Sequence, residues 1–259
     1  MMHAAALREK LARGELIIGG HVFLTDPEVT ESLGMHGFEF VWIDAEHSAF
    51  DKGEILAHVV AAAAANTASL VRVPWNDPVL VKPVLEMGPD GIILPMVSSA
   101  EEARAAVAAC RYPPSGVRGF GPRRANAYGA MDTREYLAHA DERLLKIMQI
   151  EHVRAVENLE EILAVPGVDL IIVGPNDLSA SVGHLGDTRH PEVIALYDEI
   201  ERTAKRMHKP FGVSLGAGDR VSIEDWVRRG AALIGCGDDL SYLSMGSKAT
   251  LSFVRALTR

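Results

Sequence analysis

The sequence predicts an α/β fold, the (β/α)8 or TIM barrel, from two observations. First, eight short aliphatic runs recur along the 259 residues, and longer helical patterns separate them. Second, most runs, such as 40–43 and 170–173, are continuously apolar, which is typical of strands buried on both faces. An open doubly wound sheet is the structural alternative. Its dinucleotide-binding form is disfavoured because no G-x-G-x-x-G turn opens the first βα unit.

The expected strands are the β-branched or aliphatic runs Glu15–Gly20, Phe38–Asp44, Ser69–Val73, Gly91–Leu94, Leu145–Ile150, Asp169–Val173, Phe211–Leu215 and Ala232–Cys236. The expected helices are the segments between them, namely Pro27–His36, Lys52–Ala65, Pro78–Met87, Ala100–Cys110, Arg154–Leu163, Pro191–His208, Ile223–Arg229 and Asp239–Thr258. Helix starts are indicated by the pairs Asp26-Pro27 and Asp77-Pro78, and helix ends by Gly37, Gly88 and Gly230.

One long excursion interrupts this alternation. Residues Arg111–Ala130 are rich in proline, glycine and arginine, and a short helix is expected near Thr133–Ala140. Nothing in the composition indicates a linker, so we expect a single domain over residues 1–259.

Composition excludes several classes of function. A net charge of −9 argues against a nucleic-acid partner, because phosphate binding needs a basic surface. The most apolar stretch, 59–65, is far shorter than the roughly 20 residues of a membrane span. Charged residues within the first 14 positions leave no signal-peptide core, and two cysteines make no disulfide framework. A cytoplasmic location is therefore expected.

Polar residues stand at the carboxyl ends of the expected strands, where barrels carry their active sites. Glu151 and Asp177 follow adjacent strands, so their carboxylates are candidate ligands of one divalent ion. Alternatively, each carboxylate caps the helix that follows it.

His47 and Arg72 form a second candidate pair. A histidine titrates near neutral pH and can transfer a proton, and Asp44 or Glu46 is close enough in sequence to orient it. Arg72 offers a fixed positive charge for a carboxylate or an enolate oxygen. The alternatives are a surface histidine and an arginine that only forms a salt bridge to Glu46.

Weaker signals lie in the loops. Residues Gly174-Pro175-Asn176 would either present backbone N–H groups to an anionic carboxylate at a helix amino terminus or form only a tight turn. The segments Gly216-Ala217-Gly218 and Gly235-Cys236-Gly237 are expected in the loops after the last two strands, where many barrels bind phosphate. Three arginines of the long excursion would bind an acidic group or face solvent or another subunit: Arg118, Arg123 and Arg124. Cys236 is interpreted as a small buried hydrophobe.

Six segments in order resemble the class II (metal-dependent) pyruvate aldolases of the HpcH/HpaI family over nearly the whole chain. They are Trp42-Ile43-Asp44-Ala45-Glu46-His47, Val71-Arg72-Val73-Pro74, Leu94-Pro95-Met96-Val97, the stretch 111–119 (RYPPSGVRG), Gln149-Ile150-Glu151 and the stretch 173–179 (VGPNDLS).

The resemblance implies reversible cleavage of a 4-hydroxy-2-oxo acid into pyruvate, or hydroxypyruvate, and an aldehyde. It implies that Glu151 and Asp177 hold Mg²⁺, Mn²⁺ or Co²⁺, that Arg72 stabilises the enolate oxygen and that His47, oriented by Asp44, moves protons. It also implies a substrate site that includes Gln149, Gly174, Pro175, Asn176 and Asp177. The family further implies a hexamer, a trimer of dimers whose last helix is exchanged between neighbours.

The sequence departs from the family at several positions. His21 stands where tryptophan is usual, Asn176 where alanine is common and His152 where a small hydroxyl residue is common. The Arg118–Gly129 loop differs from the diacid aldolases and is closer to members that accept hydroxypyruvate or simple aldehydes. These differences leave the aldehyde open.

Three other mechanisms or functions are weighed against metal-dependent aldol chemistry. A Schiff base needs a lysine at a strand end, whereas Lys146 lies several positions before Glu151. An acyl-CoA lyase of the citrate lyase β-subunit type would need the three loop arginines to bind CoA. A barrel that only senses an oxo acid would not need His47 and Arg72.

Overall fold

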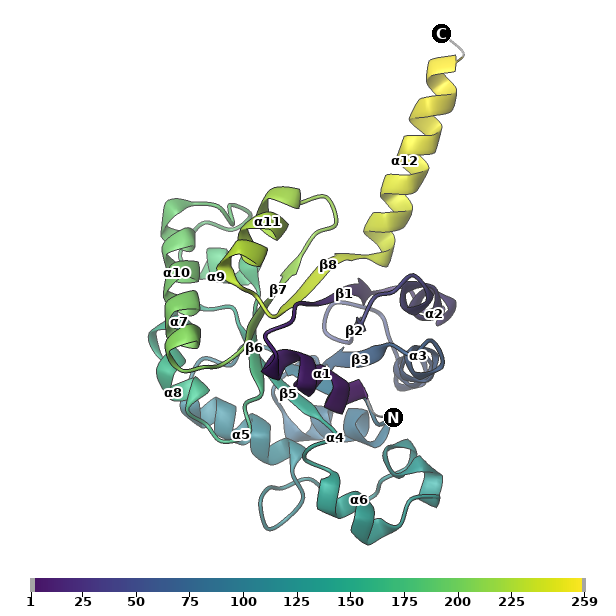
Figure 1. The fold of residues 1–259 in the computed structure, drawn as a ribbon, viewed down its shortest axis with the longest axis vertical. Helices are drawn as coiled ribbons and strands as arrows, with labels where there is room; N and C mark the ends of the chain where they lie inside the picture. Colours follow the sequence, from purple (N-terminus) through teal and green to yellow (C-terminus); the bar gives the residue numbers. More distant parts are fainter. Residues whose placement is uncertain (1–2, 258–259) are drawn as a thin grey trace.

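A computed structural model describes residues 3–257 and shows a closed barrel of parallel strands in the order β1 to β8 (Figure 1). The strands are β1 Ile17–Val22, β2 Phe40–Asp44, β3 Ala68–Arg72, β4 Gly91–Leu94, β5 Leu145–Ile150, β6 Leu170–Val173, β7 Phe211–Leu215 and β8 Leu233–Asp238. All eight expected strands are confirmed, and β4, β5 and β7 have the expected bounds. The (β/α)8 architecture is confirmed, and the open sheet is excluded because β8 pairs with β1.

Helices cover the outside of the barrel, except the last one, which extends away from it (Figure 1). They are α1 His3–Ala12, α2 Glu28–Met35, α3 Lys52–Ala64, α4 Pro78–Glu86, α5 Ala100–Cys110, α6 Thr133–His139, α7 Val153–Glu157, α8 Leu159–Leu163, α9 Pro175–Ser181, α10 Pro191–Arg206, α11 Arg220–Arg229 and α12 Asp239–Leu257, with a 3-10 helix, η1, at Arg124–Gly129. The sequence did not predict α1, η1 or α9. The expected end of the last helix, Thr258, lies outside the described residues.

One expected helix, Arg154–Leu163, is wrong in its continuity, because Asn158 separates α7 from α8. The side chain of Asn158 donates a hydrogen bond to the backbone oxygen of Ser98, 2.9 Å away. This contact with a distant segment holds the backbone of Asn158 outside the helical region, at φ −100° and ψ 12°.

Two apolar clusters hold the barrel together. Every second strand residue points inward and forms the filled interior, which includes Phe40, Trp42, Leu70, Ile147 and Ile172. The intervening residues face outward and pack under the helices, forming a larger outer cluster. The continuous apolar runs of the sequence reflect this burial on both faces.

The last helix, α12, projects away from the barrel (Figure 1). Its large apolar side chains are exposed in the single chain, among them Leu243, Leu251, Phe253 and Val254. Among the described residues, no helix is both long and apolar enough to cross a membrane.

Candidate active site

The inward-facing row of each strand continues from the apolar interior into polar residues at the carboxyl end. Trp42 is followed two residues later by Asp44, and Leu70 by Arg72. Because Asp44 and Arg72 are aligned in the β2–β3 pairing, their side chains emerge next to each other. Alternate residues of a strand face the same side, so the rows that form the interior also place Asp44 and Arg72 in the site.

Arg72 is held by two carboxylates. Its Nε donates to Asp44 Oδ1 at 3.1 Å, its Nη2 pairs with Asp44 Oδ2, and its Nη1 lies 3.0 Å from Glu46 Oε2. Burial raises the pKa of Asp44, but the hydrogen bonds and charge of Arg72 outweigh it, so this pKa lies below its ordinary value. A planar guanidinium held on both sides has a fixed orientation.

His47 lies at the rim, and 62% of its side chain is exposed. Its Nε2 lies 3.8 Å from Glu46 Oε2, whereas its backbone N–H donates to Asp44 Oδ1 at 3.1 Å. Asp44 also accepts from the backbone N–H of Glu46 at 3.0 Å. Asp44 thus holds the loop backbone and Arg72, and Glu46 is the carboxylate beside the ring. That Asp44 orients His47 stays a prediction.

Glu151 follows β5 and faces the same mouth. Its Oε1 accepts from the backbone N–H of Met96 at 2.8 Å, and its Oε2 accepts from the side-chain amide of Gln149. Burial raises the pKa of Glu151 to about 7, and the negative charges of Glu46 and Asp177 contribute to the rise. The buried carboxyl of Glu151 is therefore influenced by two carboxylates that are less buried, those of Glu46 and Asp177.

The backbone donor at Met96 could not be identified from residue type. Met96 has a φ of 55°, in the left-handed region that residues other than glycine seldom adopt. This conformation accompanies the hydrogen bond from its N–H to Glu151. The segment 94–97 was noted only as a family landmark, and the structure gives it a contact with the site.

Asp177 lies in the first turn of α9 and is exposed. Gly174 precedes this helix and lies against Glu151: a Cβ added at Gly174 would stand 2.7 Å from Glu151 Oε2. Pro175 is buried, while Asn176 is exposed. The structure thus brings the β6–α9 turn against the β5 end, as the sequence predicted.

The donor set fits a divalent cation. Carboxylate oxygens of Glu151, Asp177 and Glu46 influence one another electrostatically, and Arg72 is the cation paired with Glu46. Gln149 also has a buried Oε1 without a hydrogen-bond partner. Hard oxygen donors of this kind suit Mg²⁺ or Mn²⁺, whose remaining positions are filled by water or substrate.

His21 is part of the barrel interior. Its Nδ1 lies 3.0 Å from the backbone oxygen of Gly237, its Nε2 lies 3.0 Å from Ser214 Oγ, and its ring packs 4.7 Å from Trp42. Burial lowers its pKa, so the neutral ring is favoured. His21 is thus a buried, hydrogen-bonded residue beneath the mouth.

Two of the three loop arginines, Arg118 and Arg124, are buried. The three arginines therefore do not form an exposed cluster that could bind CoA. Arg118 donates to the backbone oxygen of Leu85 and to Glu86, and Arg124 donates to the backbone oxygens of Met87 and Gly88. Their guanidinium groups anchor the long excursion to the end of α4. The sequence could not distinguish this role from anion binding.

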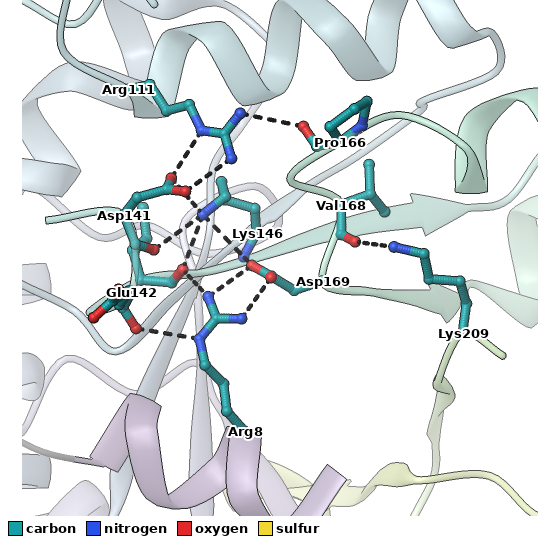
Figure 2. Close-up of polar contacts among 10 residues, drawn as sticks. Arg8, Arg111, Asp141, Glu142, Lys146, Pro166, Val168, Asp169 and Lys209 are labelled. Atoms are coloured by element: carbon teal, nitrogen blue, oxygen red, sulfur yellow. Dashed lines mark hydrogen bonds and ion pairs between the residues drawn. The ribbon is translucent and has the colours of Figure 1, made fainter. Parts of the chain in front are cut away.

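Lys146 lies at the opposite end of the barrel from the site. Its Nζ donates to Asp141 at 2.9 Å and lies 3.6 Å from Asp169 (Figure 2). Arg8 and Arg111 complete a basal ion cluster with these three residues (Figure 2). Lys146 is 1% exposed and cannot reach a substrate at the carboxyl ends of the strands.

The segment Gly235-Cys236-Gly237 lies within β8 and not in the loop after it, which corrects its expected placement. A Cβ at Gly235 would stand 2.6 Å from a carbon of His21. The glycine makes room for the imidazole inside the barrel. Cys236 is partly buried, and burial raises its pKa, in agreement with an unreactive thiol.

Comparison with known proteins agrees with this geometry. A 5-keto-4-deoxy-D-glucarate aldolase from Klebsiella pneumoniae is 37% identical over 231 residues, 89% of each chain. A hydroxypyruvate/pyruvate aldolase from Roseovarius nubinhibens is 34% identical over 245 residues, 95% of each chain. The crystal structure of an HpcH/HpaI aldolase/citrate lyase family protein from Burkholderia cenocepacia superposes with a TM-score of 0.91 at 34% identity, covering 96% of this chain and 99% of that one. The family model for HpcH/HpaI aldolase/citrate lyase matches residues 18–244, and the chain therefore belongs to this family.

Proposed function

We propose that the protein is a metal-dependent aldolase that cleaves 4-hydroxy-2-oxo acids reversibly into pyruvate, or hydroxypyruvate, and an aldehyde. The observation that carries the proposal is the guanidinium of Arg72, which Asp44 and Glu46 hold, with His47 close to the same Glu46 carboxylate. Relatives named as sugar-acid and hydroxypyruvate aldolases support the same reaction.

Each side chain has a defined task in this reaction. When the C3–C4 bond breaks, its electrons move toward the C2 oxygen, and the N–H groups of Arg72 stabilise the charge that develops there. The exposed imidazole of His47 accepts the proton of the C4 hydroxyl as the aldehyde forms, with Glu46 beside the ring. The side-chain amide of Gln149 positions Glu151.

Glu151 and Asp177 would hold a divalent ion, Mg²⁺, Mn²⁺ or Co²⁺. When bound, it supplies a Lewis acid that stabilises enolate charge by several kcal/mol. Gly174, Pro175, Asn176 and Asp177 border the region in which the substrate carboxylate would lie, which supports their assignment to substrate binding.

The acceptor aldehyde and the assembly are finer proposals. We assign a small or sugar-derived aldehyde, because one relative is named a 5-keto-4-deoxy-D-glucarate aldolase and the other a hydroxypyruvate/pyruvate aldolase. The exposed apolar residues of α12 support a homo-oligomer, a hexamer in which this helix is exchanged between subunits.

The decisive experiment incubates purified protein with pyruvate, an aldehyde and Mg²⁺ or Mn²⁺. We expect an aldol adduct that EDTA abolishes and added metal restores. Adduct formation at an undiminished rate after complete metal removal would refute the proposal. The Lys146→Met variant is a control for a Schiff-base mechanism. It lacks the buried lysine but keeps the residues at the mouth of the barrel.

A further inference from the structure

A second group of metal-ligand side chains lies outside the candidate active site, between α9 and α10. His184, His190 and Glu192 each offer one ligand atom, and these atoms all lie within 4.8 Å of one another. His184 comes from the loop that follows α9, while His190 caps α10 and Glu192 lies in its first turn. The sequence spacing, H-x5-H-x-E, brings two imidazoles and a carboxylate to one point.

The contacts within this cluster are unusually close. Nε2 of His184 lies 2.9 Å from Glu192 Oε2, and the rings of His184 and His190 are stacked with centroids 3.4 Å apart and planes 20° apart. His190 Nδ1 accepts a hydrogen bond of 3.3 Å from the backbone N–H of Glu192. The loop already brings both imidazoles to the carboxylate without a large change of backbone.

Two imidazole nitrogens and one carboxylate oxygen form a ligand set for zinc. Zinc binds such atoms at about 2.0–2.1 Å with tetrahedral geometry, which places ligand atoms about 3.4 Å apart. The observed spread is at most 4.8 Å, so the ligand atoms must approach one another by up to about 1.4 Å. The stacked rings must also rotate apart, because an imidazole nitrogen binds zinc in the plane of its ring. The active-site donors are oxygens and amides, so the two sites differ in chemistry.

We propose that His184, His190 and Glu192 form a Zn²⁺ site, with water as the fourth ligand. The ion joins the α9–α10 loop to the first turn of α10. The backbone N–H of His184 already donates to Ser179 in α9 at 2.8 Å, so the ion also ties down the far end of the helix that begins beside Gly174. The site is structural, and it is independent of the proposed aldolase reaction.

The alternative is a simple ion pair between His184 and Glu192, with His190 acting only as a helix cap. A similar pair without a second imidazole exists elsewhere in the chain, because His139 Nδ1 lies 3.1 Å from Glu142 Oε2. This pair provides a matched control. It has the same two residue types but lacks the third ligand.

The test is a titration with Co²⁺, followed by displacement with Zn²⁺. Tetrahedral Co²⁺ bound by nitrogen ligands absorbs visible light strongly, whereas Co²⁺ in a six-coordinate oxygen site absorbs weakly. We expect one strongly absorbing Co²⁺ per chain, retained in His139→Ala and in Glu151→Gln/Asp177→Asn, and lost in His184→Ala and in His190→Asn. Asparagine retains a helix cap, so loss in His190→Asn reports the ligand and not the fold.

Thermal unfolding provides an independent measurement. Zinc at about 100 times its dissociation constant raises the melting temperature of a chain of this size by roughly 5–10 °C if it binds only the folded state. We expect this shift in Glu151→Gln/Asp177→Asn and its loss in His190→Asn. A Co²⁺ band or a zinc shift that survives both histidine substitutions would overturn the proposal, as would their loss in the active-site double variant alone.

Discussion

Gly174 sets the position of Glu151, and replacing it with alanine tests the geometry of the metal site. An added Cβ would stand 2.7 Å from Glu151 Oε2 and 3.0 Å from the amide nitrogen of Gln149. Ordinary contacts begin near 3.4 Å, so the carboxylate must move by about 0.7 Å. The backbone of Gly174 has a φ of −99° and suits alanine, so the change acts through contacts with the side chains of Glu151 and Gln149 and not through backbone strain.

A displaced ligand weakens metal binding more than it weakens the fold. Disturbing the groups that orient metal ligands typically costs 10- to 100-fold in affinity, or about 1.4–2.7 kcal/mol. We therefore expect the dissociation constant for Mn²⁺ to rise by about 10- to 100-fold in Gly174→Ala. The melting temperature should change less than the Mn²⁺ affinity, because the atoms that must yield belong to the side chains of Glu151 and Gln149 and not to the backbone.

Manganese binding is measured from the free Mn²⁺ signal in electron paramagnetic resonance, beside the initial rate of pyruvate release and thermal unfolding. The matched control is Gly216→Ala, which follows the next strand, β7, and has no atom within 4 Å of the added Cβ. The control should bind Mn²⁺ like the unmodified chain. Equal Mn²⁺ affinity in Gly174→Ala and Gly216→Ala would refute the placement of Glu151 as a ligand.

Three further perturbations test other parts of the chain. Arg72→Lys keeps the charge but cannot hold Asp44 with two hydrogen bonds, so kcat should fall about 10²- to 10³-fold in a pyruvate-release assay; an unchanged kcat would make Arg72 structural. Lys146→Met should lower the free energy of unfolding in urea by about 1–3 kcal/mol and leave kcat unchanged, because the ion pair with Asp141 is only partly buried; loss of activity at unchanged stability would contradict this. The hydrogen bonds of Arg111 hold the pKa of Asp141 below its ordinary value, although burial acts in the opposite direction. This carboxylate therefore stabilises the fold above about pH 4, and its contribution is lost as the pH falls. Asp141→Asn should accordingly be less stable at pH 7 and lose less stability between about pH 5 and pH 2, and parallel losses in both proteins would show that Asp141 is not responsible.

The strands were predictable because burial on both faces appears in the sequence as short apolar runs. β4, β5 and β7 have the expected bounds since each is a short, mainly aliphatic run with a polar residue, glycine or proline beside it. Helix α9 was not among the expected helices because it has only seven residues. Its N-cap, Gly174, and its first residues, Pro-Asn-Asp, have the composition of a turn. The break at Asn158 depends on a hydrogen bond to Ser98, which local sequence cannot reveal.

The candidate site was predictable where it depends on strand ends. Asp44 and Arg72 share a register, so the barrel topology alone brings them together. Contacts made through the backbone were not predictable, because the N–H of Met96 carries no signal in its side chain. The role of Glu46 was underestimated for another reason: sequence could not show that it faces both Arg72 and His47.

The basal ion cluster has a consequence for how such a barrel diversifies. Lys146, Asp141 and Asp169 fasten the long excursion and the amino-terminal helix to the floor of the barrel, at the end remote from the mouth (Figure 2). Residues that stabilise the fold and residues of the active site thereby lie at opposite ends of the barrel, as is general for this architecture. Residues around the mouth can then be exchanged with little penalty to the scaffold, which gives the chain room to evolve toward new aldehydes.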